Sequence, residues 1–113
     1  MQADLSSIEE TYLLANQALE LFSTVDILVN NAGVVFVENL LDTTLEHWEA
    51  TQAVNVRAPF LLTQKLVPKM IRQKREKIVN IFSVAALLAP VGHAVYSASK
   101  GSLNLLTQTM AAE

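Results

Sequence analysis

The chain has 113 residues, a length that suits one modest domain, and 51% of them are hydrophobic, so a substantial core is available. The formal charge of -3 argues against a general polyanion binder. The absence of cysteine excludes disulfides and thiolate metal sites, the two histidines are too few for a histidine-rich metal site, and a cytoplasmic setting is expected.

The N-terminal third predicts a helix followed by a strand. Ser6 and Glu9 have the spacing of a capping box, with Ser6 as the N-cap. Apolar residues recur at helical spacing from Ile8 to Phe22, which predicts a helix with one apolar face. The segment DILVNNAG then contains a short continuous apolar run, 27–29, that ends in Asn and Gly. Such a run is typical of a strand buried on both faces.

A long helical region is expected from residue 42 to residue 77. Thr43 and Glu46 form a second possible capping box, and Pro59 should kink or divide the helix because it has no N–H and its ring crowds the preceding turn. The cationic end, 69–77, suits a helix C-terminus and its negative dipole. No aromatic residue interleaves these charges, so we prefer this interpretation to nucleic-acid binding.

The last third predicts a strand, a loop and a helix. The strand is KIVNIFS, 77–83, the loop contains Pro90 and Gly92, and the helix begins near Val95 and runs to the end. Strands that alternate with longer helices imply parallel βαβ units and an α/β layer fold within a single partial domain, 1–113. The apolar runs are short and interrupted, well below the ~20 residues that span a bilayer, and MQADLSSIEE lacks the features of a signal peptide, so no membrane association is predicted.

Three residues near the predicted strand end and the last helix could carry chemistry. Ser83 is expected at the C-terminal end of a parallel strand, where α/β sheets bind ligands. Tyr96 and Lys100 are four apart and therefore share a helix face. A phenol titrates near ~10, and a neighbouring ammonium favours its phenolate form. With a serine hydroxyl, the pair would form an acid/base device for interconverting C=O and CH–OH, while the hydride must come from elsewhere.

Each of these signals has a simpler structural interpretation. A Y-x-x-x-K pair alone is more often a solvated helix face, and a serine after a strand is usually a turn residue or a cap. An asparagine beside a proline in a kinked helix, such as Asn55, is usually a polar side chain that only satisfies local hydrogen bonds. NNAG alone is most often a turn.

The conjunction of these motifs resembles the classical short-chain dehydrogenases/reductases over essentially all of the chain. The resemblance includes DL at 4–5, NNAG at 30–33, Asn55 in AVNVRAPF, Ser83 after KIVNIFS, and YSASK at 96–100, in the family's order and spacing. It implies a Rossmann-like, three-layer doubly wound parallel sheet, present here as an incomplete fragment.

The resemblance also implies roles for the catalytic residues. Tyr96 would be the general acid/base, and Lys100 would favour its phenolate and hold the nicotinamide ribose. Ser83 would orient the substrate carbonyl. Asn55 would hold a water in a proton relay that runs to Lys100. His93, three residues before Tyr96, is interpreted as a loop residue, with a place in the lining of the substrate pocket as the alternative.

A second group of residues would bind the cofactor, NAD or NADP. The resemblance places Asp4 and Leu5 beside the adenine, and Asn30, Ala32 and Gly33 near the adenine-side ribose, where they also brace the central strand. No metal site and no nucleic-acid partner are implied. The family commonly pairs subunits through two helices, here 55–73 and 96–113, so a homo-oligomer is expected.

The sequence departs from the family pattern at both ends. The glycine-rich turn T-G-x-x-x-G-x-G cannot be present, because the only glycines are Gly33, Gly92 and Gly101. The segments that usually set NAD or NADP preference and cover the substrate are also absent. The sequence therefore indicates neither which of the two cofactors is preferred nor which substrate is bound. The resemblance therefore implies a carbonyl/alcohol oxidoreductase whose isolated 113-residue chain has little activity and whose sheet has a free strand edge. The alternative is a non-catalytic Rossmann-like fragment that acts through self-association.

Overall fold

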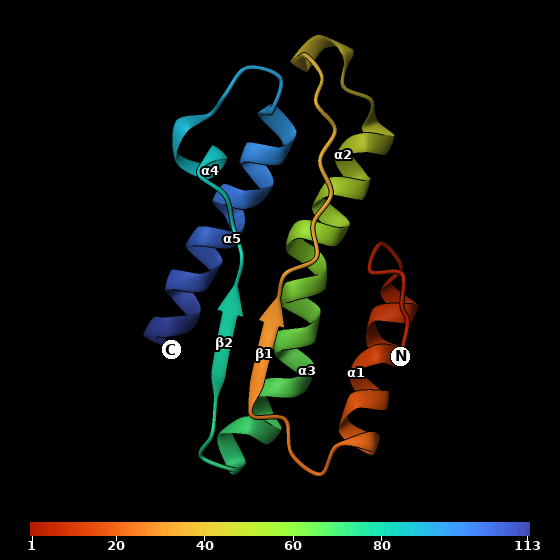
Figure 1. The fold of residues 1–113 in the computed structure, drawn as a ribbon, viewed down its shortest axis with the longest axis vertical. Helices are drawn as coiled ribbons and strands as arrows, with labels where there is room; N and C mark the ends of the chain where they lie inside the picture. Colours follow the sequence, from red (N-terminus) through yellow and green to blue (C-terminus); the bar gives the residue numbers. More distant parts are fainter.

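The computed structural model describes all residues, 1–113, as alternating helices and strands (Figure 1). This alternation confirms the predicted element order, and it adds a short helix, α4, within the segment predicted to be a loop. The elements are α1 (Ile8–Leu21), β1 (Ile27–Asn30), a 3₁₀ turn η1 (Leu40–Asp42), α2 (Leu45–Gln52), a π-helical turn η2 (Ala53–Arg57), α3 (Ala58–Arg72), β2 (Lys77–Asn80), α4 (Ala85–Leu88) and α5 (Ala94–Ala112).

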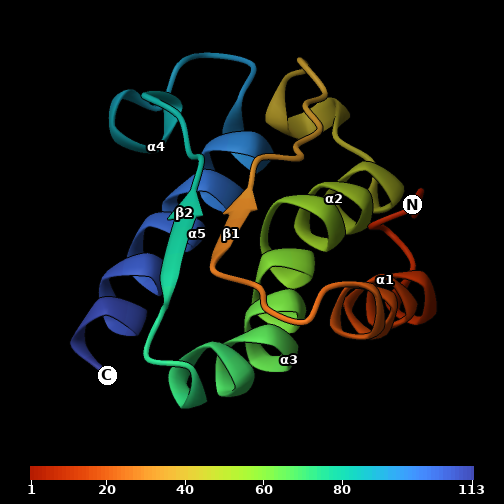
Figure 2. The ribbon, with the colours of Figure 1, turned by 60° about the horizontal axis from the view of Figure 1, so that its bottom comes forward.

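The two strands form a parallel sheet that carries helices on one face. β1 and β2 pair in register from Ile27 opposite Lys77 to Asn30 opposite Asn80. The helices α3 and α5 lie behind the strands, and α1 lies beside α3 (Figures 1 and 2). The α/β architecture with a parallel sheet is confirmed, and the chain holds two of the three layers that the family resemblance implies.

The opposite face of the sheet is open. Ile27 and Val29, which point away from the helices, are 57% and 54% exposed, whereas Leu28 between them is half-buried. The prediction that this strand is buried on both faces is therefore wrong for this chain. A continuous apolar run indicates two-sided burial, but no segment of residues 1–113 covers the second face. β1 pairs only with β2, so its other edge is free, as predicted.

Both predicted helix caps are displaced by one residue. The Oγ atom of Ser7, not of Ser6, accepts a hydrogen bond from the backbone N–H of Glu10 at 3.2 Å and caps α1. The Oγ1 atom of Thr44, not of Thr43, accepts from the N–H of His47 and caps α2. The preceding hydroxyls are used elsewhere: Ser6 donates to the Asp4 carboxylate, and Thr43 donates to the backbone carbonyl of Asn39, just before η1.

The helix around Pro59 changes its hydrogen-bond pattern instead of ending. The N–H of Ala58 bonds to the carbonyl of Ala53, which makes a π-helical turn, and Pro59 then occupies the first turn of α3. The missing N–H of proline is tolerated there. The predicted kink or division at Pro59 therefore takes another form: a π-helical turn separates α2 from α3, and this turn contains Asn55. A second proline, Pro68, lies inside α3, and the helix continues through it.

The core is small and lies where α1 crosses α3 beneath β1. Ala15 of α1 packs with Leu62, Leu66 and Met70 of α3, and Leu28 of β1 contacts this cluster. None of the helices combines the length and the apolar character that crossing a membrane requires.

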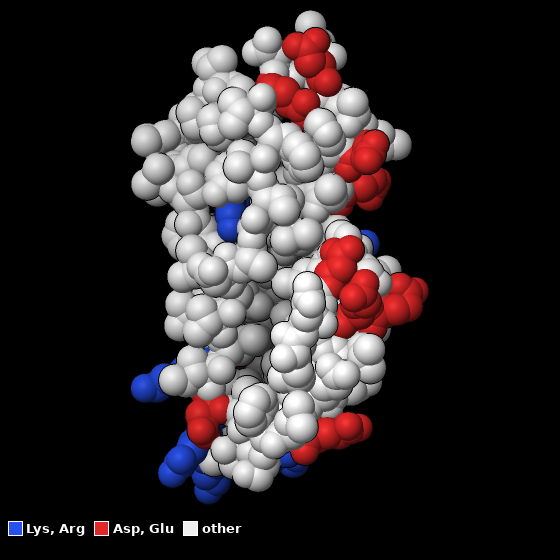
Figure 3. Space-filling model, turned by 45° about the vertical axis from the view of Figure 1, so that its right-hand side comes forward, with Lys and Arg blue, Asp and Glu red and all other residues white.

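The charged side chains are segregated on the surface. Basic side chains gather at the end of the molecule where the strands begin, and acidic side chains lie mainly along another flank (Figure 3). Lys74, Arg75 and Lys77 line a shallow hollow with Asp26 at this basic end. The carboxyl ends of the strands point away from it.

Candidate active site

Tyr96 and Lys100 lie side by side on the first two turns of α5. The Nζ atom of Lys100 is 5.8 Å from the centroid of the Tyr96 ring. The prediction that the two side chains share a helix face is confirmed. A phenol and an ammonium at this distance interact favourably, and the interaction is stronger for a phenolate than for a neutral phenol.

Lys100 is buried without a carboxylate partner. Its residue is 4% exposed, and Nζ donates a hydrogen bond of 3.0 Å to the backbone carbonyl of Ile81. Burial lowers the pKa of Lys100 from its ordinary value of 10.5, because the ammonium loses hydration. A buried cation that makes one protein hydrogen bond keeps two N–H groups for other acceptors.

This burial predicts that Lys100 lowers the stability of the fold near neutral pH. The unfolded chain keeps its proton up to about pH 10.5, so it binds more protons than the folded chain between the two pKa values. The free energy of unfolding that Lys100 contributes therefore rises as pH increases from the pKa of the folded state toward that of the unfolded chain.

Lys100→Met should be at least as stable as the parent at pH 7, and its advantage in free energy of unfolding should shrink toward pH 10. Urea unfolding at both pH values measures this, with exposed Lys77→Met as the control. An advantage that is independent of pH would contradict the prediction.

Asn55 is the polar anchor of the site and is fully buried in the π-helical turn. Its Oδ1 accepts from the N–H of Val34 at 2.9 Å, and its Nδ2 donates to the carbonyl of Val34 at 2.9 Å and to the Oγ of Ser99 at 3.0 Å. Ser99 in turn donates to the carbonyl of Tyr96. Asn55 thereby joins the segment after β1 to the Tyr96 turn of α5. The water-holding role predicted for Asn55 stays a prediction.

Gly33 leaves the space that the Lys100 side chain needs. A Cβ atom at Gly33 would lie 3.3 Å from Nζ of Lys100 and 3.5 Å from Oδ1 of Asn55. A side chain there would crowd the ammonium. The structure thus brings together Gly33, Asn55, Tyr96 and Lys100 from three separate parts of the sequence.

Ser83 lies beyond the strand in which it was predicted. The predicted strand 77–83 is too long, since β2 ends at Asn80 and the chain then turns toward α4. The Oγ of Ser83 accepts a hydrogen bond from the N–H of Ala85 at 3.1 Å. Ser83 makes no hydrogen bond to Tyr96 or Lys100, although Lys100 binds the carbonyl only two residues earlier, at Ile81.

Asn30 belongs to a polar chain across the covered face of the sheet. Its Nδ2 donates to the Oδ1 of Asn80 at 2.8 Å, and Asn80 donates to Thr107 of α5 at 2.9 Å. These side chains brace β1 against β2 and α5. This contact agrees with the bracing function expected for the NNAG segment, whereas cofactor contact by Asn30 stays a prediction.

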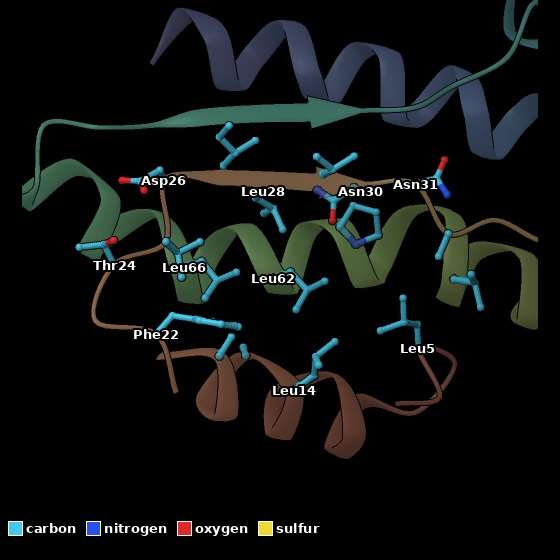
Figure 4. A pocket seen from close by; sticks show the side chains of 18 residues that line it. Leu5, Leu14, Phe22, Thr24, Asp26, Leu28, Asn30, Asn31, Leu62 and Leu66 are labelled. Carbon is cyan, nitrogen blue, oxygen red and sulfur yellow. The ribbon is translucent and has the colours of Figure 1, made fainter. Parts of the chain in front are cut away.

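The residues predicted near the adenine gather along the free edge of β1. Leu5 and Ala32 line an apolar hollow of about 450 Å³ together with Asn30. Figure 4 shows Leu14 and Phe22 pointing across this hollow toward Leu62 and Leu66 of α3. The hollow is separate from the Tyr96–Lys100 pair, so the predicted cofactor residues fall into two groups.

Asp4 lies in the turn that leads into α1. Its Oδ1 accepts hydrogen bonds from the hydroxyl and the N–H of Ser6, and these bonds lower the pKa of Asp4. Arg57 donates to the carbonyl of Ser6 and ties this turn to η2. Arg57 and Ser99 were not predicted as site residues. The sequence shows that Ser99 is one helical turn from Tyr96, but it does not show that Ser99 contacts Asn55, 44 positions earlier.

His93 lies against Tyr96, the candidate acid/base residue. Its ring meets that of Tyr96 edge to face, with centroids 6.1 Å apart, and its Nδ1 is 3.1 Å from the carbonyl of Val91. A carbonyl can only accept, so Nδ1 carries a proton in this contact. His93 is thus the residue that precedes α5 and also a neighbour of Tyr96, which is compatible with both interpretations of the sequence.

Comparison with known proteins gives one consistent result. Residues 1–113 match the family model described as short chain dehydrogenase. The chain is 38% identical over its whole length to a 3-oxoacyl-[acyl-carrier-protein] reductase of Synechocystis and covers 46% of that protein. It is 33% identical to an NAD-dependent glycerol dehydrogenase of Listeria innocua and covers 44% of it.

Solved structures resemble the fold closely. A metagenomic short-chain oxidoreductase in complex with NADP superimposes with a TM-score of 0.92 at 37% identity, over 97% of this chain and 50% of that one. A 4-hydroxyisoleucine dehydrogenase complexed with NADH gives a TM-score of 0.90 at 35% identity, over 98% and 49%. The chain spans about half the length of the relatives that it matches.

Proposed function

Because the chain belongs to the short-chain dehydrogenase family, we propose that the polypeptide carrying it is a nicotinamide-dependent oxidoreductase that interconverts a carbonyl and an alcohol. The observation that supports this most directly is the pairing of the Tyr96 phenol with the buried Lys100 ammonium, 5.8 Å from the ring centroid. Relatives named as a reductase and a dehydrogenase, and solved relatives complexed with NADP or NADH, support the reaction type and the cofactor class.

Tyr96 moves the proton in the proposed reaction. In reduction its phenolic O–H donates to the substrate carbonyl oxygen, and in oxidation the phenolate takes the alcohol proton back. The positive charge of Lys100 stabilises the phenolate that remains after donation. The hydroxyl of Ser83 donates to the same carbonyl oxygen and orients it. When bound, a nicotinamide cofactor supplies the hydride in reduction and accepts it in oxidation.

Part of this chain fits a nicotinamide cofactor. The ammonium of Lys100 has free N–H groups for a ribose hydroxyl, and Gly33 keeps the space beside it open. The pyrophosphate end is different, because the three glycines of the chain do not form a glycine-rich turn. We therefore propose that residues 1–113 alone support little or no turnover.

The proposal is tested by comparing two proteins. The complete polypeptide that carries residues 1–113 should oxidise NADH or NADPH in the presence of small ketones, whereas the isolated segment 1–113 should not. Robust turnover by the isolated segment would refute the proposed dependence on further residues. No turnover by the complete polypeptide with either cofactor would refute the oxidoreductase assignment.

Self-association is a second candidate function, favoured by one feature of the outer helix surface. A shallow groove between η2, α3 and α5 is lined by Val56, Phe60 and Leu106, and Phe60 is exposed. A second copy of the chain would cover this groove through the helices 55–73 and 96–113. Sedimentation at increasing concentration should show a dimer or larger assembly that Phe60→Ser weakens. A monomer at all concentrations would dispose of this candidate.

A further inference from the structure

Backbone hydrogen bonds hold His93 at the point where α5 begins. Its N–H donates to the carbonyl of Pro90 at 3.2 Å, and its own carbonyl accepts from the N–H of Ser97 at 2.7 Å. The first bond closes the turn before the helix, and the second belongs to the first turn of α5. The backbone of His93 is therefore fixed relative to the helix that carries Tyr96.

The loop before His93 is also held from its other side. The N–H of Glu38, in the segment after β1, donates to the carbonyl of Gly92 at 3.0 Å. Gly92 has a φ of +81°, and a Cβ there would lie 3.3 Å from Val37, so the loop and this segment are closely packed. Glu38 is in turn held by α2, because its Oε1 lies 2.8 Å from Nδ1 of His47. These contacts keep the loop in place beside α5.

One polar and one aromatic contact orient the imidazole ring of His93. Its Nδ1 donates to the carbonyl of Val91 at 3.1 Å, which fixes the rotation of the ring. The ring centroid lies 6.1 Å from that of Tyr96, and the two planes are inclined by 66°. This is the edge-to-face arrangement that aromatic pairs prefer. The His93 ring therefore limits the positions that the Tyr96 ring can take.

The position of the Tyr96 ring decides where its phenolic oxygen lies. The oxygen is at the far end of the side chain, so a small rotation about the first side-chain torsion displaces it more than any other atom of the residue. General acid catalysis needs this oxygen within about 2.6–3.2 Å of the group that receives the proton. A displacement of about 1 Å can lower a rate by about 10²-fold. The contact with His93 thus bears on catalysis even though His93 need not touch the substrate.

We propose that His93 is a positioning residue for the acid/base group. Its ring holds the Tyr96 ring at the angle from which the phenolic oxygen reaches the substrate oxygen, and its hydrogen bond to Val91 holds the His93 ring itself. This inference rests on the proposed function and adds to it a residue that acts through Tyr96 without transferring a proton.

The first test uses the complete polypeptide that carries residues 1–113, with the ketone that it reduces fastest among cyclohexanone, 2-octanone and ethyl acetoacetate. His93→Ala should lower kcat about tenfold, because the phenolic oxygen is less well placed in the transition state. The KM values for the ketone and for the cofactor should stay within about twofold. The unfolding midpoint should stay close to the parent's, because the His93 side chain is only partly buried.

Three outcomes of this test would overturn the inference. An unchanged kcat, or a loss confined to KM, would do so while leaving the proposed oxidoreductase intact. Reduction of none of the three ketones by the parent would overturn the inference and the proposed function together.

Two further variants separate the ring contact from the hydrogen bond. His93→Phe keeps an aromatic ring against Tyr96 but removes the Nδ1–H group that binds Val91. His93→Asn keeps a side-chain N–H donor for Val91 but removes the ring. His93→Phe should recover most of the kcat that His93→Ala loses, and His93→Asn should not. Recovery by His93→Asn alone would assign the effect to the loop and contradict a role through the Tyr96 ring.

A double-mutant cycle tests whether His93 acts through the phenol. In the Tyr96→Phe variant the ring remains but there is no hydroxyl to place, so adding His93→Ala should lower the remaining kcat by less than about twofold. A further loss of about tenfold would show that His93 acts on the substrate or the cofactor independently of the hydroxyl, and the inference would fail.

Discussion

Tyr96→Phe is expected to lower kcat/KM for carbonyl reduction by about 10²- to 10⁴-fold, the usual contribution of a positioned acid/base group. The substitution removes one oxygen atom and leaves the ring, with its edge contact to His93 and its position beside Lys100, in place. Proton donation to the substrate oxygen is lost, while the packing of α5 is retained. The loss should therefore appear in kcat and not in the stability of the protein.

The sequence offers a matched control for this measurement. Tyr12, the only other tyrosine, lies on α1 beneath the ammonium of Lys65, 5.0 Å from its ring centroid, and takes no part in the site. Tyr12→Phe should leave kcat/KM unchanged within about twofold, whereas Tyr96→Phe should retain the parent's unfolding midpoint. If Tyr96→Phe kept more than about a tenth of the activity, the phenol would not be the acid/base group.

Asn55→Ala is expected to lower the free energy of unfolding by roughly 3 kcal/mol, because each buried polar group left unpaired costs about 1–3 kcal/mol. The substitution would free both backbone polar groups of Val34 and the hydroxyl of Ser99 from their hydrogen bonds with Asn55. A loss of this size is a large part of the about 5–15 kcal/mol that stabilises a typical domain. The segment after β1 would also lose its attachment to α5.

Urea unfolding measures the effect, and two further variants define its cause. Asn16→Ala, at an exposed position of α1, should cost less than about 0.5 kcal/mol. Asn55→Asp keeps the size and the oxygen atom that accepts from the N–H of Val34 but removes the donor to Ser99 and to the carbonyl of Val34, so it should also destabilise the protein. A cost below about 1 kcal/mol for Asn55→Ala would refute the role of this residue as the polar anchor.

The sequence predicted the order of the elements and the pairing on α5 because both depend on local spacing. The predicted strands begin where β1 and β2 begin, although the second was predicted to run to residue 83 and ends at Asn80. The four-residue spacing of Tyr96 and Lys100 places them on one helix face. The caps failed by one residue because two hydroxyl residues stand next to each other at each helix start. Which of them caps the helix depends on the turn before it, where Asp4 and Asn39 engage the first hydroxyl.

The contacts that build the site were less predictable because they join distant parts of the sequence. The amide of Asn55 reaches Ser99, and that of Asn30 reaches Asn80, 50 positions away. The short helix α4 contains four residues, too few for a helical period to appear in the sequence. The open face of the sheet could not be read from β1 itself, since the same apolar run would also suit a strand covered on both sides.

Transfer of deuterium tests the central claim of carbonyl/alcohol chemistry most directly. The complete polypeptide that carries residues 1–113 would be incubated with 2-octanone and with NADH or NADPH deuterated at C4 of the nicotinamide, each face in turn. Mass spectrometry of the alcohol product should show deuterium on the carbinol carbon with one labelled face, and this product should be lost with Tyr96→Phe. Alcohol that forms without the label from either face, or label transfer that is unaffected by Tyr96→Phe, would contradict the account.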